Sequence, residues 1–360
     1  MSGAPVLLEH PSSLEHDPGP HPEQPARLEA IWRELEAHDW FGFERLRSPM
    51  VDRAVLAAVH EPDYIDTIER LCARGGGHLD LDTVVSRGSF DAALHAAGGA
   101  VALVDLLLDH AVPTGFSVHR PPGHHASAAR GMGFCLFNSV AVAAEYARAR
   151  RGLERVMIFD WDVHHGNGTN DIFRASHEVL FVSVHQMPLY PGTGPASDVG
   201  AGNGAGYTVN LPVAPGSDDF VFLSMVEHVV IPLAVEFAPQ LVLVSAGYDA
   251  HGDDPLGGCL VTEAGFAAMT SVVARTCASL EAPLGFVLEG GYSLGGLSRS
   301  VAATLEALDT SPPVAGTSEP LGKLPPKLSL AEGGDSVAPV ALEARSRVAR
   351  WWPALADATL

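Results

Sequence analysis

The segment Asp160-Trp-Asp-Val-His-His-Gly-Asn-Gly168 carries side chains suited to holding a divalent metal. It follows an apolar run typical of a strand, so Asp162 and His164, two positions apart, are expected to point the same way. Asp249 ends a second such run. Two carboxylates and one imidazole make a three-ligand set that leaves a position open for water and substrate. Residue types alone leave Zn²⁺, Fe²⁺, Mn²⁺ and Co²⁺ open, and a single Asp at a strand end is more often a helix cap.

His124-His125 forms a second constellation, directly after Pro-Pro-Gly. Adjacent histidines are poor core residues because the polar ends of both rings need partners. Hydrolysis by a metal-activated water requires a base for the water proton and an acid for the leaving amine. Each ring must also be oriented at its other nitrogen, and Asp160 and Asn167 are suitably placed for this. We interpret the pair as acid–base groups; a structural loop pair is the alternative.

Three aromatic residues follow or interrupt Gly-rich turns. Tyr292 comes after Gly-Gly, and a phenol hydroxyl at that place is able to stabilise a developing oxyanion. Phe134 and Tyr190 lie on Gly-rich loops, where they are suited to walling a narrow tunnel for an aliphatic chain. An ordinary turn tyrosine and simple packing under the loops are the respective alternatives.

Five short, nearly continuous apolar runs predict buried parallel strands. They are Thr114–Val118, Val156–Phe159, Val179–Val184, Leu241–Ser245 and Leu284–Leu288. Amphipathic stretches predict helices at Ser89–Asp109, Phe137–Arg150, Asp219–Phe237, Glu263–Leu280 and Leu294–Leu308. This alternation predicts βαβ crossovers and a three-layer α/β/α fold with a central, mostly parallel sheet. Ligands bind beyond the carboxyl ends of such strands. Four polar clusters fall there, and they contain His124, Asp160, Asp249 and Tyr292.

The termini are expected to complete the same unit. A helix is predicted over Glu23–Ala37, a Pro/Gly-rich loop over 310–336, and a helix around Val340–Arg350 that packs back through Trp351 and Trp352. We therefore predict one domain over 1–360, with a core over about 5–310 and a C-terminal helical piece over 337–360.

Composition limits the possible partners. The net charge is −21, which argues against nucleic acid and is compatible with a cationic substrate, although acidic surfaces are often simply soluble ones. The four cysteines are widely spaced, so free thiols are expected. The N-terminus lacks an apolar leader, and apolar runs are broken within about a dozen positions, too few to span a bilayer. We expect a cytoplasmic, bacterial protein without a membrane partner, and leave a homo-oligomer open.

These residues occur in ordered blocks that resemble the histone deacetylase superfamily over roughly 5–310. The similarity is greatest to the class II branch and to bacterial histone-deacetylase-like amidohydrolases, with acetylpolyamine amidohydrolases as relatives. The blocks are His21-Pro-Glu-Gln-Pro-Ala-Arg-Leu28, Arg120-Pro-Pro-Gly-His-His-Ala126, Gly133-Phe-Cys135, Asp160 to Thr169, Ser183-Val-His185, Tyr248-Asp-Ala-His251, Asp254-Pro-Leu-Gly-Gly258 and Glu289-Gly-Gly-Tyr292.

The resemblance implies an arginase-like α/β fold and one catalytic zinc. By motif position, the zinc ligands would be Asp162, His164 and Asp249. His125 would be the general base, His124 its electrostatic partner, and Tyr292 the group that holds the scissile carbonyl. Asp160 would orient His124, and Asn167 would orient His125.

The resemblance also implies a tunnel and a second ion. The tunnel would be lined by Phe134, Tyr190, Leu256, Gly133 and Asp82. A structural potassium is implied near the backbone of Asp160, Asp162, His164, Ser183 and Val184. Asn167 stands where class I enzymes carry Asp, so we expect a lower pKa for His125, and Tyr190 replaces a common tunnel Phe.

Four functions compete. The first is hydrolysis of N-acetyl-lysine in a peptide or protein, and the second is deacetylation of acetylpolyamines. Leu256 stands where the eukaryotic polyamine-selective relative is expected to carry a Glu, which favours acyl-lysine, although Asp82, Asp253 and Asp254 could present acid groups at the rim. A dinuclear manganese ureohydrolase would need a second ligand set, and an inactive acyl-lysine-binding module would be expected to lack one of the catalytic groups.

Overall fold

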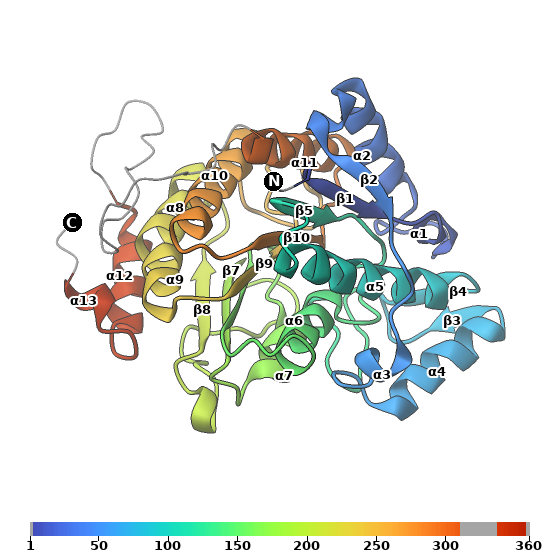
Figure 1. The fold of residues 1–360 in the computed structure, drawn as a ribbon, viewed down its shortest axis with the longest axis horizontal. Coiled ribbons are helices and arrows are strands. Elements are labelled where there is room, and N and C mark those ends of the chain that lie inside the picture. Colours follow the sequence, from blue (N-terminus) through green and yellow to red (C-terminus); the bar gives the residue numbers. More distant parts are fainter. Residues whose placement is uncertain (1–2, 310–336, 358–360) are drawn as a thin grey trace.

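The computed structural model describes residues 3–309 and 337–357 and is built around one large sheet (Figure 1). Its strands are β1 (Val6–Glu9), β2 (Glu44–Arg47), β5 (Thr114–Ser117), β6 (Val156–Asp160), β7 (Val179–Gln186), β8 (Thr208–Val213), β9 (Leu241–Ala246) and β10 (Leu284–Leu288). Their order is β2-β1-β5-β10-β9-β6-β7-β8, and every neighbouring pair is parallel. All five predicted strands are confirmed within two residues at each end.

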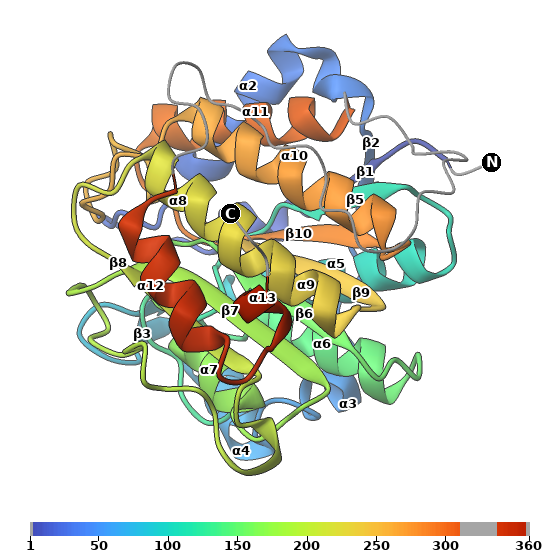
Figure 2. The same ribbon diagram turned by 90° about the vertical axis from the view of Figure 1, so that its left-hand side faces the viewer.

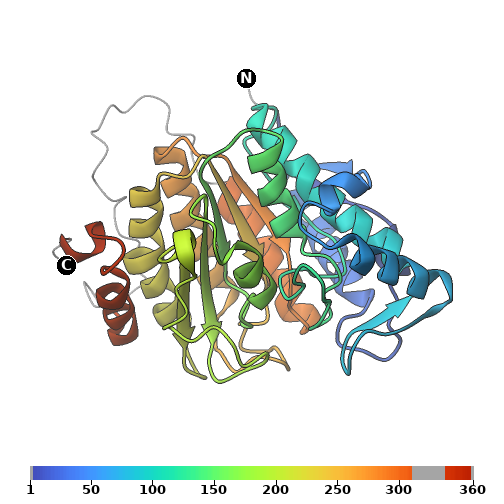
Figure 3. The same ribbon diagram turned by 90° about the horizontal axis from the view of Figure 1, so that it is seen from below.

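Helices cover both faces of the sheet, which confirms the predicted three-layer α/β/α architecture (Figures 1 and 3). One face carries α2 (Ala26–Ala37), α8 (Asp219–Met225), α9 (Ile231–Phe237), α10 (Glu263–Ser279) and α11 (Leu294–Asp309). The other carries α4 (Pro62–Ala73), α5 (Ser89–Leu108), α6 (Ser139–Ala149) and α7 (Asn167–Phe173).

Strand β6 shows why the apolar runs are continuous. Met157 and Phe159 pack into the core under α8 and α10, whereas Val156 and Ile158 pack into the core under α5 and α6. Side chains alternate between the two faces of a strand, so a strand covered on both sides must be apolar at every position.

Most predicted helices are present, with shifted ends that have local causes. Asn138 caps α6 by accepting from the N–H of Ala141, so this helix begins at Ser139 rather than Phe137. The predicted helix over Asp219–Phe237 consists of α8, a π-helical turn over Val226–Val230, and α9. Pro232 lacks an N–H, so the regular hydrogen-bond pattern is interrupted at this point.

Several elements were not predicted. They are β1, β2 and β8 in the sheet, the hairpin of β3 (Gly76–His78) and β4 (Val84–Ser86), the helices α4 and α7, and the short helices α1 (Ser12–Glu15) and α3 (Arg53–Leu56). Strands β1 and β2 extend the sheet beyond β5, and β8 forms its other edge beyond β7.

The C-terminal helix α12 (Pro339–Val348), followed by α13 (Ala354–Asp357), lies beside α8 and strand β8 (Figure 2). Trp352 is buried there, and its Nε1 donates to the carbonyl of Gly206 at 2.8 Å. Trp351 is 42% exposed but also lies against Gly206, so both tryptophans contact the domain and Trp352 is the more buried of the two. The loop predicted over 310–336 lies outside the described residues.

Two helical stretches, Ser89–Leu108 and Asp219–Phe237, are long and apolar enough to cross a membrane by length and composition. The expectation that every apolar run is too short is therefore wrong. The shares of these stretches buried inside the protein are 61% and 67%, as in core helices.

Candidate active site

The four polar clusters predicted from the sequence meet at one edge of the sheet. They follow β5, β10, β9 and β6, which are consecutive neighbours in the strand order. Because parallel strands end at the same edge, their loops converge there, as predicted.

Asp162, His164 and Asp249 are brought together at this edge, and all three are buried. Nδ1 of His164 lies 3.1 Å from Oδ1 of Asp162 and 3.1 Å from Oδ2 of Asp249. The second oxygen of each carboxylate accepts from a backbone N–H: Oδ2 of Asp162 from Gly290, and Oδ1 of Asp249 from Val163, both at 2.9 Å. The ligand atoms lie within 4.8 Å of one another.

This spacing fits a tetrahedral metal. Ligand atoms about 2.0–2.2 Å from one zinc ion stand roughly 3.3 Å apart, close to the separations found here. The charges fit as well. Burial alone would lower the pKa of His164, but Asp249 and Asp162 outweigh burial and raise it to about 10. Burial and Asp162 raise the pKa of Asp249 to about 7. Two carboxylates facing one imidazole therefore attract additional positive charge.

A second group with metal-ligand chemistry consists of His124, Cys135 and Glu289. Two of its potential ligand atoms are already hydrogen-bonded: Oε2 of Glu289 accepts from the N–H groups of Gly123 and His124, and Nδ1 of His124 donates to Asp160. Burial also raises the pKa of the Cys135 thiol well above its usual value, which disfavours the thiolate that a metal requires. The first cluster is therefore the better candidate metal centre.

The two adjacent histidines are oriented by the predicted partners. Nδ1 of His124 donates to Oδ2 of Asp160 at 3.0 Å, and Nδ1 of His125 donates to Oδ1 of Asn167 at 2.8 Å. The two rings lie 4.0 Å apart between centroids, and the His125 ring is 5.9 Å from that of His164. Both Nε2 atoms are left for chemistry on the side of the metal centre.

The pKa values of the two histidines are shifted in opposite directions. Burial would lower the pKa of His124, but Asp162 and Asp160 outweigh burial and raise it well above 6.5. Burial and the neighbouring His124 lower the pKa of His125 well below 6.5, in keeping with an amide rather than a carboxylate at Asn167. The pair thus combines a charged imidazole with a neutral one that is able to accept a proton.

Tyr292 lies beside this centre on the loop after β10. A Cβ atom at Gly290 would come within 2.1 Å of Oδ2 of Asp249, so a side chain there would push the loop away. Gly291 has φ of +117°, a conformation that favours glycine. Burial raises the pKa of the Tyr292 phenol well above 10, which keeps the hydroxyl as a hydrogen-bond donor.

The predicted tunnel residues stand around the same centre. The Tyr190 ring meets His125 edge to face at 5.3 Å, and the Phe134 ring meets Tyr292 edge to face at 5.5 Å. A Cβ atom at Gly133 would lie 2.3 Å from Cδ2 of His125, so only glycine allows this loop to approach. Phe134 and Tyr190 thus form an aromatic wall on two sides of this centre.

Two further predicted residues lie near this wall. Asp82 is half-buried at the β3–β4 hairpin, and its carboxylate accepts from the hydroxyl of Thr83. Thr83 in turn accepts from the N–H of Phe134 at 3.1 Å, so the hairpin supports the wall. Leu256 is also half-buried, on the loop after β9. Asp254, expected as a rim acid, is instead buried and bonded to backbone amides.

Sequence reasoning missed a buried ion network beneath the site. Glu23 lies between Arg27, Arg120 and His16, with distances of 3.0 Å to Nη1 of Arg27 and 2.7 Å to Nη2 of Arg120. Arg27 stacks over the Tyr292 ring at 4.8 Å and donates to the carbonyl of Gly291 at 2.6 Å. The available signal was Arg120 directly before the Pro-Pro-Gly turn and the His21-Pro-Glu block.

The residues expected near a potassium ion also meet. Asp160 and Ser183 are paired across β6 and β7, and both are fully buried. The Ser183 hydroxyl contacts Nδ1 of His185 at 2.9 Å, so His185 has a structural partner. Val184 follows within the same buried strand.

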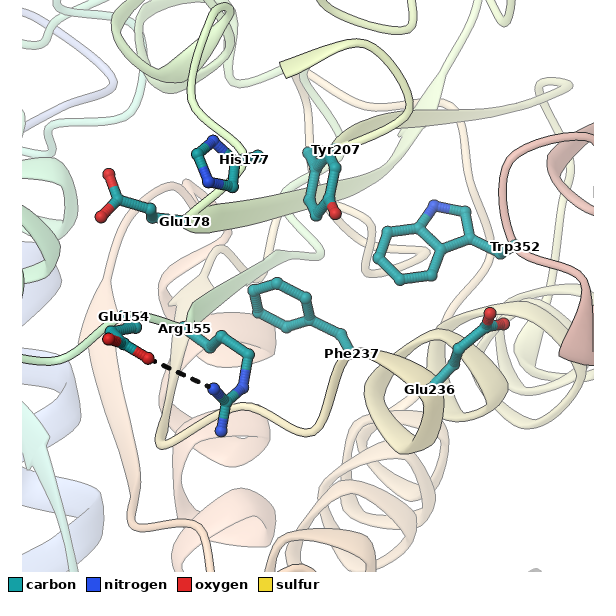
Figure 4. Close-up of a pocket in the computed structure, with 8 residues that line it drawn as sticks. All are labelled: Glu154, Arg155, His177, Glu178, Tyr207, Glu236, Phe237 and Trp352. Atoms are coloured by element: carbon teal, nitrogen blue, oxygen red, sulfur yellow. Dashed lines mark ion pairs between the residues drawn. The ribbon is translucent and has the colours of Figure 1, made fainter. Parts of the chain in front are cut away.

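A pocket of about 390 Å³ lies at the opposite end of the sheet (Figure 4). Its residues precede strands, end helix α9 or follow helix α12. They are Glu154, Arg155, His177, Glu178, Tyr207, Glu236, Phe237 and Trp352. Glu154 precedes β6 and Glu178 precedes β7, so this pocket is separated from the candidate metal centre by the length of the strands.

Comparison with known proteins identifies the class. Residues 21–308 match the family model described as histone deacetylase domain. The chain is 39% identical to a probable deacetylase of Archaeoglobus fulgidus, covering 81% of this chain and 82% of that one. It is 38% identical to the histone deacetylase-like amidohydrolase of Pseudomonas aeruginosa, covering 76% and 72%. The chain belongs to the histone deacetylase family of deacetylases and amidohydrolases.

A solved structure shares this fold. The crystal structure of the HDA15 HD domain aligns with a TM-score of 0.87 at 35% identity, covering 99% of this chain and 97% of that one. The predicted arginase/deacetylase-like fold and the family resemblance are thereby confirmed.

Proposed function

We propose that this protein is a zinc-dependent deacetylase that hydrolyses the amide of N-acetyl-lysine in a peptide or protein, releasing free amine and acetate. The observation that carries this proposal is one buried site that combines two carboxylates facing His164, the oriented pair His124–His125, and Tyr292. Membership of the deacetylase family supports it.

Asp162, His164 and Asp249 would hold the zinc ion. A zinc ion bound there supplies Lewis acidity, which polarises the acetyl carbonyl and makes water a better nucleophile at neutral pH. The excess of negative charge around His164 supports a dication at this position. We further propose a structural potassium near Asp160, Ser183 and Val184, supported by the burial of the Asp160 carboxylate beside Ser183.

The histidine pair would move the protons. Nδ1 of His125 is occupied by Asn167, so Nε2 is the atom that takes the proton of the attacking water. That proton is later needed by the leaving amine, because an uncharged amine leaves more readily than its anion. His124, held in its charged form by Asp160 and Asp162, would offset the negative charge that develops on the acetyl oxygen.

Tyr292 would donate its hydroxyl proton in a hydrogen bond to the same oxygen. Its high pKa keeps that proton in place, and its edge-to-face contact with Phe134 limits movement of the ring. Phe134 and Tyr190 would hold the lysine methylene chain between them, leaving the acetyl group at the metal centre.

The main alternative substrate is an acetylated polyamine or another small N-acyl amine. Asp80 and Asp82 give it some support, since burial and Asp80 raise the pKa of Asp82, which indicates two close carboxylates near the wall. The half-buried Leu256 offers no charge to a distal ammonium and favours acyl-lysine.

The test is a comparison of kcat/KM on an acetyl-lysine peptide and on N-acetylputrescine with the same zinc-loaded preparation. We expect at least a tenfold preference for the peptide. A preference of that size for N-acetylputrescine would assign the protein to the polyamine branch, and release of acetate from neither would refute deacetylation of both.

A further inference from the structure

Asp254 is a buried carboxylate that binds the backbone of two different loops. Its Oδ1 accepts from the N–H of Leu256 at 2.9 Å, on its own loop after β9. Its Oδ2 accepts from the N–H groups of Tyr292 at 2.6 Å and Ser293 at 3.0 Å, on the loop after β10. Its side chain is shielded from solvent, with 7% of the residue exposed.

The loop that carries Tyr292 is held from both sides. Asp254 binds its N–H groups, while Arg27 donates to the carbonyls of Gly291 and Glu289, each at 2.6 Å. One residue earlier, the N–H of Gly290 donates to Asp162 in the metal cluster. Both the N–H groups and the carbonyl groups of the backbone around Tyr292 are therefore hydrogen-bonded to side chains.

Burying a carboxylate is costly unless it is well bonded. A charged acceptor makes shorter and stronger hydrogen bonds to backbone N–H groups. The contact to the N–H of Tyr292 is short, at 2.6 Å. A strong hydrogen bond therefore holds the backbone of the residue that carries the phenol.

We propose that Asp254 is a positioning residue for the deacetylase reaction. It fixes the backbone of Tyr292 so that the phenol stands at the metal centre, and through Leu256 it links that position to the rim of the tunnel. The inference rests on the proposed function, because the role of Tyr292 belongs to that proposal.

Two substitutions separate geometry from charge. Asp254→Asn keeps the shape but replaces one acceptor oxygen by a donor group, whereas Asp254→Glu keeps the charge and displaces it. The matched control is Asp253→Asn, because Asp253 is adjacent, has a side chain 65% exposed, and pairs with Arg299 on α11. Single-turnover rates with enzyme in excess are measured for each variant, alone and together with Tyr292→Phe.

We expect both Asp254 substitutions to slow acetate release by about 10- to 100-fold, as small displacements of a catalytic group do. In the Tyr292→Phe background the same substitutions should change the rate by no more than about 2-fold, because the group on which Asp254 acts is gone. An equal loss in both backgrounds, or no loss at all, would overturn the proposal.

Hydrogen exchange followed by mass spectrometry provides a readout independent of activity. The peptide covering 289–293 should exchange faster in Asp254→Asn than in Asp253→Asn or the unaltered protein. Unchanged exchange would refute the role of Asp254, whereas absence of acetate release by the unaltered protein would refute the proposed function alone. If Asp254→Asn does not fold, Asp254→Glu replaces it in both measurements.

Discussion

Carboxylates, histidines and aromatic rings lie at both ends of the central sheet, but the two ends differ in how deeply their charged side chains are buried. At the carboxyl end, Asp162, Asp249 and Asp160 are completely buried, and two carboxylates face one imidazole. At the amino end, Glu154 pairs with Arg155 (Figure 4) and its side chain is 80% exposed. Glu178 pairs with Arg148. A pocket is present at the amino end, yet buried and unbalanced charge is found at the carboxyl end.

This difference shows what marks a functional site. A charged side chain that is solvated or paired costs little free energy, so its presence does not indicate a functional site. A completely buried acidic group is stable only if a cation or hydrogen bonds offset the cost of removing it from water. The aromatic rings differ in the same way. Tyr207, Phe237 and Trp352 pack against one another at 5.2–6.1 Å, while Tyr190 contacts the His125 ring and Phe134 the Tyr292 ring.

The largest effect is expected for Asp249→Ala at the carboxyl end. Loss of this proposed ligand should abolish stoichiometric zinc binding and lower kcat/KM by about 10³-fold or more, because the proposed zinc ion would supply several kcal/mol of transition-state stabilisation. Zinc content and acetate release measure this. Glu178→Ala is the amino-end counterpart, and its activity should remain within about 2-fold of the unaltered protein. Equal losses in both variants would remove the distinction between the two ends.

Next is Tyr292→Phe, which deletes one hydroxyl. We expect kcat to fall by about 10²–10³-fold with zinc content unchanged, as for other oxyanion donors. Tyr207→Phe removes the corresponding hydroxyl at the amino end and should leave kcat unaltered. Steady-state kinetics on an acetyl-lysine peptide, with metal analysis of both variants, decides this. Full activity in Tyr292→Phe would exclude the phenol from the reaction.

At the amino end, Trp352→Ala should affect stability rather than chemistry. Removal of a buried tryptophan that packs on Tyr207 and Phe237 should cost about 3 kcal/mol in the free energy of unfolding. Urea denaturation measures this loss, and kcat of the folded variant should stay unchanged. A selective fall in kcat would instead show that the amino-end cluster reaches the catalytic centre.

The smallest effect concerns pH and the buried His60. Its Nε2 accepts from the N–H of Asn138 and its Nδ1 donates to the carbonyl of Ser127, so the folded state holds it neutral. Burial lowers its pKa to about 4, whereas the unfolded chain binds the proton near 6.5. Stability is therefore retained above pH 6.5 and lost as the pH falls, by about 2 kcal/mol between pH 8 and pH 5.

His60→Gln should lose less stability over this pH interval than the unaltered protein, as measured by urea denaturation at pH 8 and pH 5. The exposed His177 is the matched control at the amino end, and His177→Gln should leave the pH dependence as it is. Identical pH dependence in all three proteins would show that His60 does not titrate as described.

The central strands, and the loops whose polar residues converge, could be predicted from the sequence because both depend on local patterns. Continuous apolar runs followed by Asp, His or Gly-Gly-Tyr identified β5, β6, β9 and β10 and the loops that follow them. The missed strand β1 has only three apolar residues, Val6–Leu8, and the missed strands β2 and β8 lack this pattern. In β2, Glu44–Arg47 is mainly exposed, and β8 contains Asn210 and Pro212, which are tolerated because β8 is an edge strand.

Contacts between distant segments could not be predicted in the same way. Glu23 and Arg27 resemble the polar face of a surface helix, but both are buried under Tyr292 by the packing of α2 against α11. Asp254 was expected at the rim, and its inward orientation depends on the path of two loops 38 residues apart. Such positions are decided by tertiary packing rather than by local spacing.

Titration of the metal-free protein with Zn²⁺ tests the central claim most directly. After removal of metal by a chelator, zinc is added in steps while acetate release from an acetyl-lysine peptide is measured. We predict activity that rises linearly and stops rising at one zinc ion per chain, with no such rise in Asp249→Ala. Full acetate release by the metal-free protein, or a requirement for two zinc ions per chain, would contradict the account.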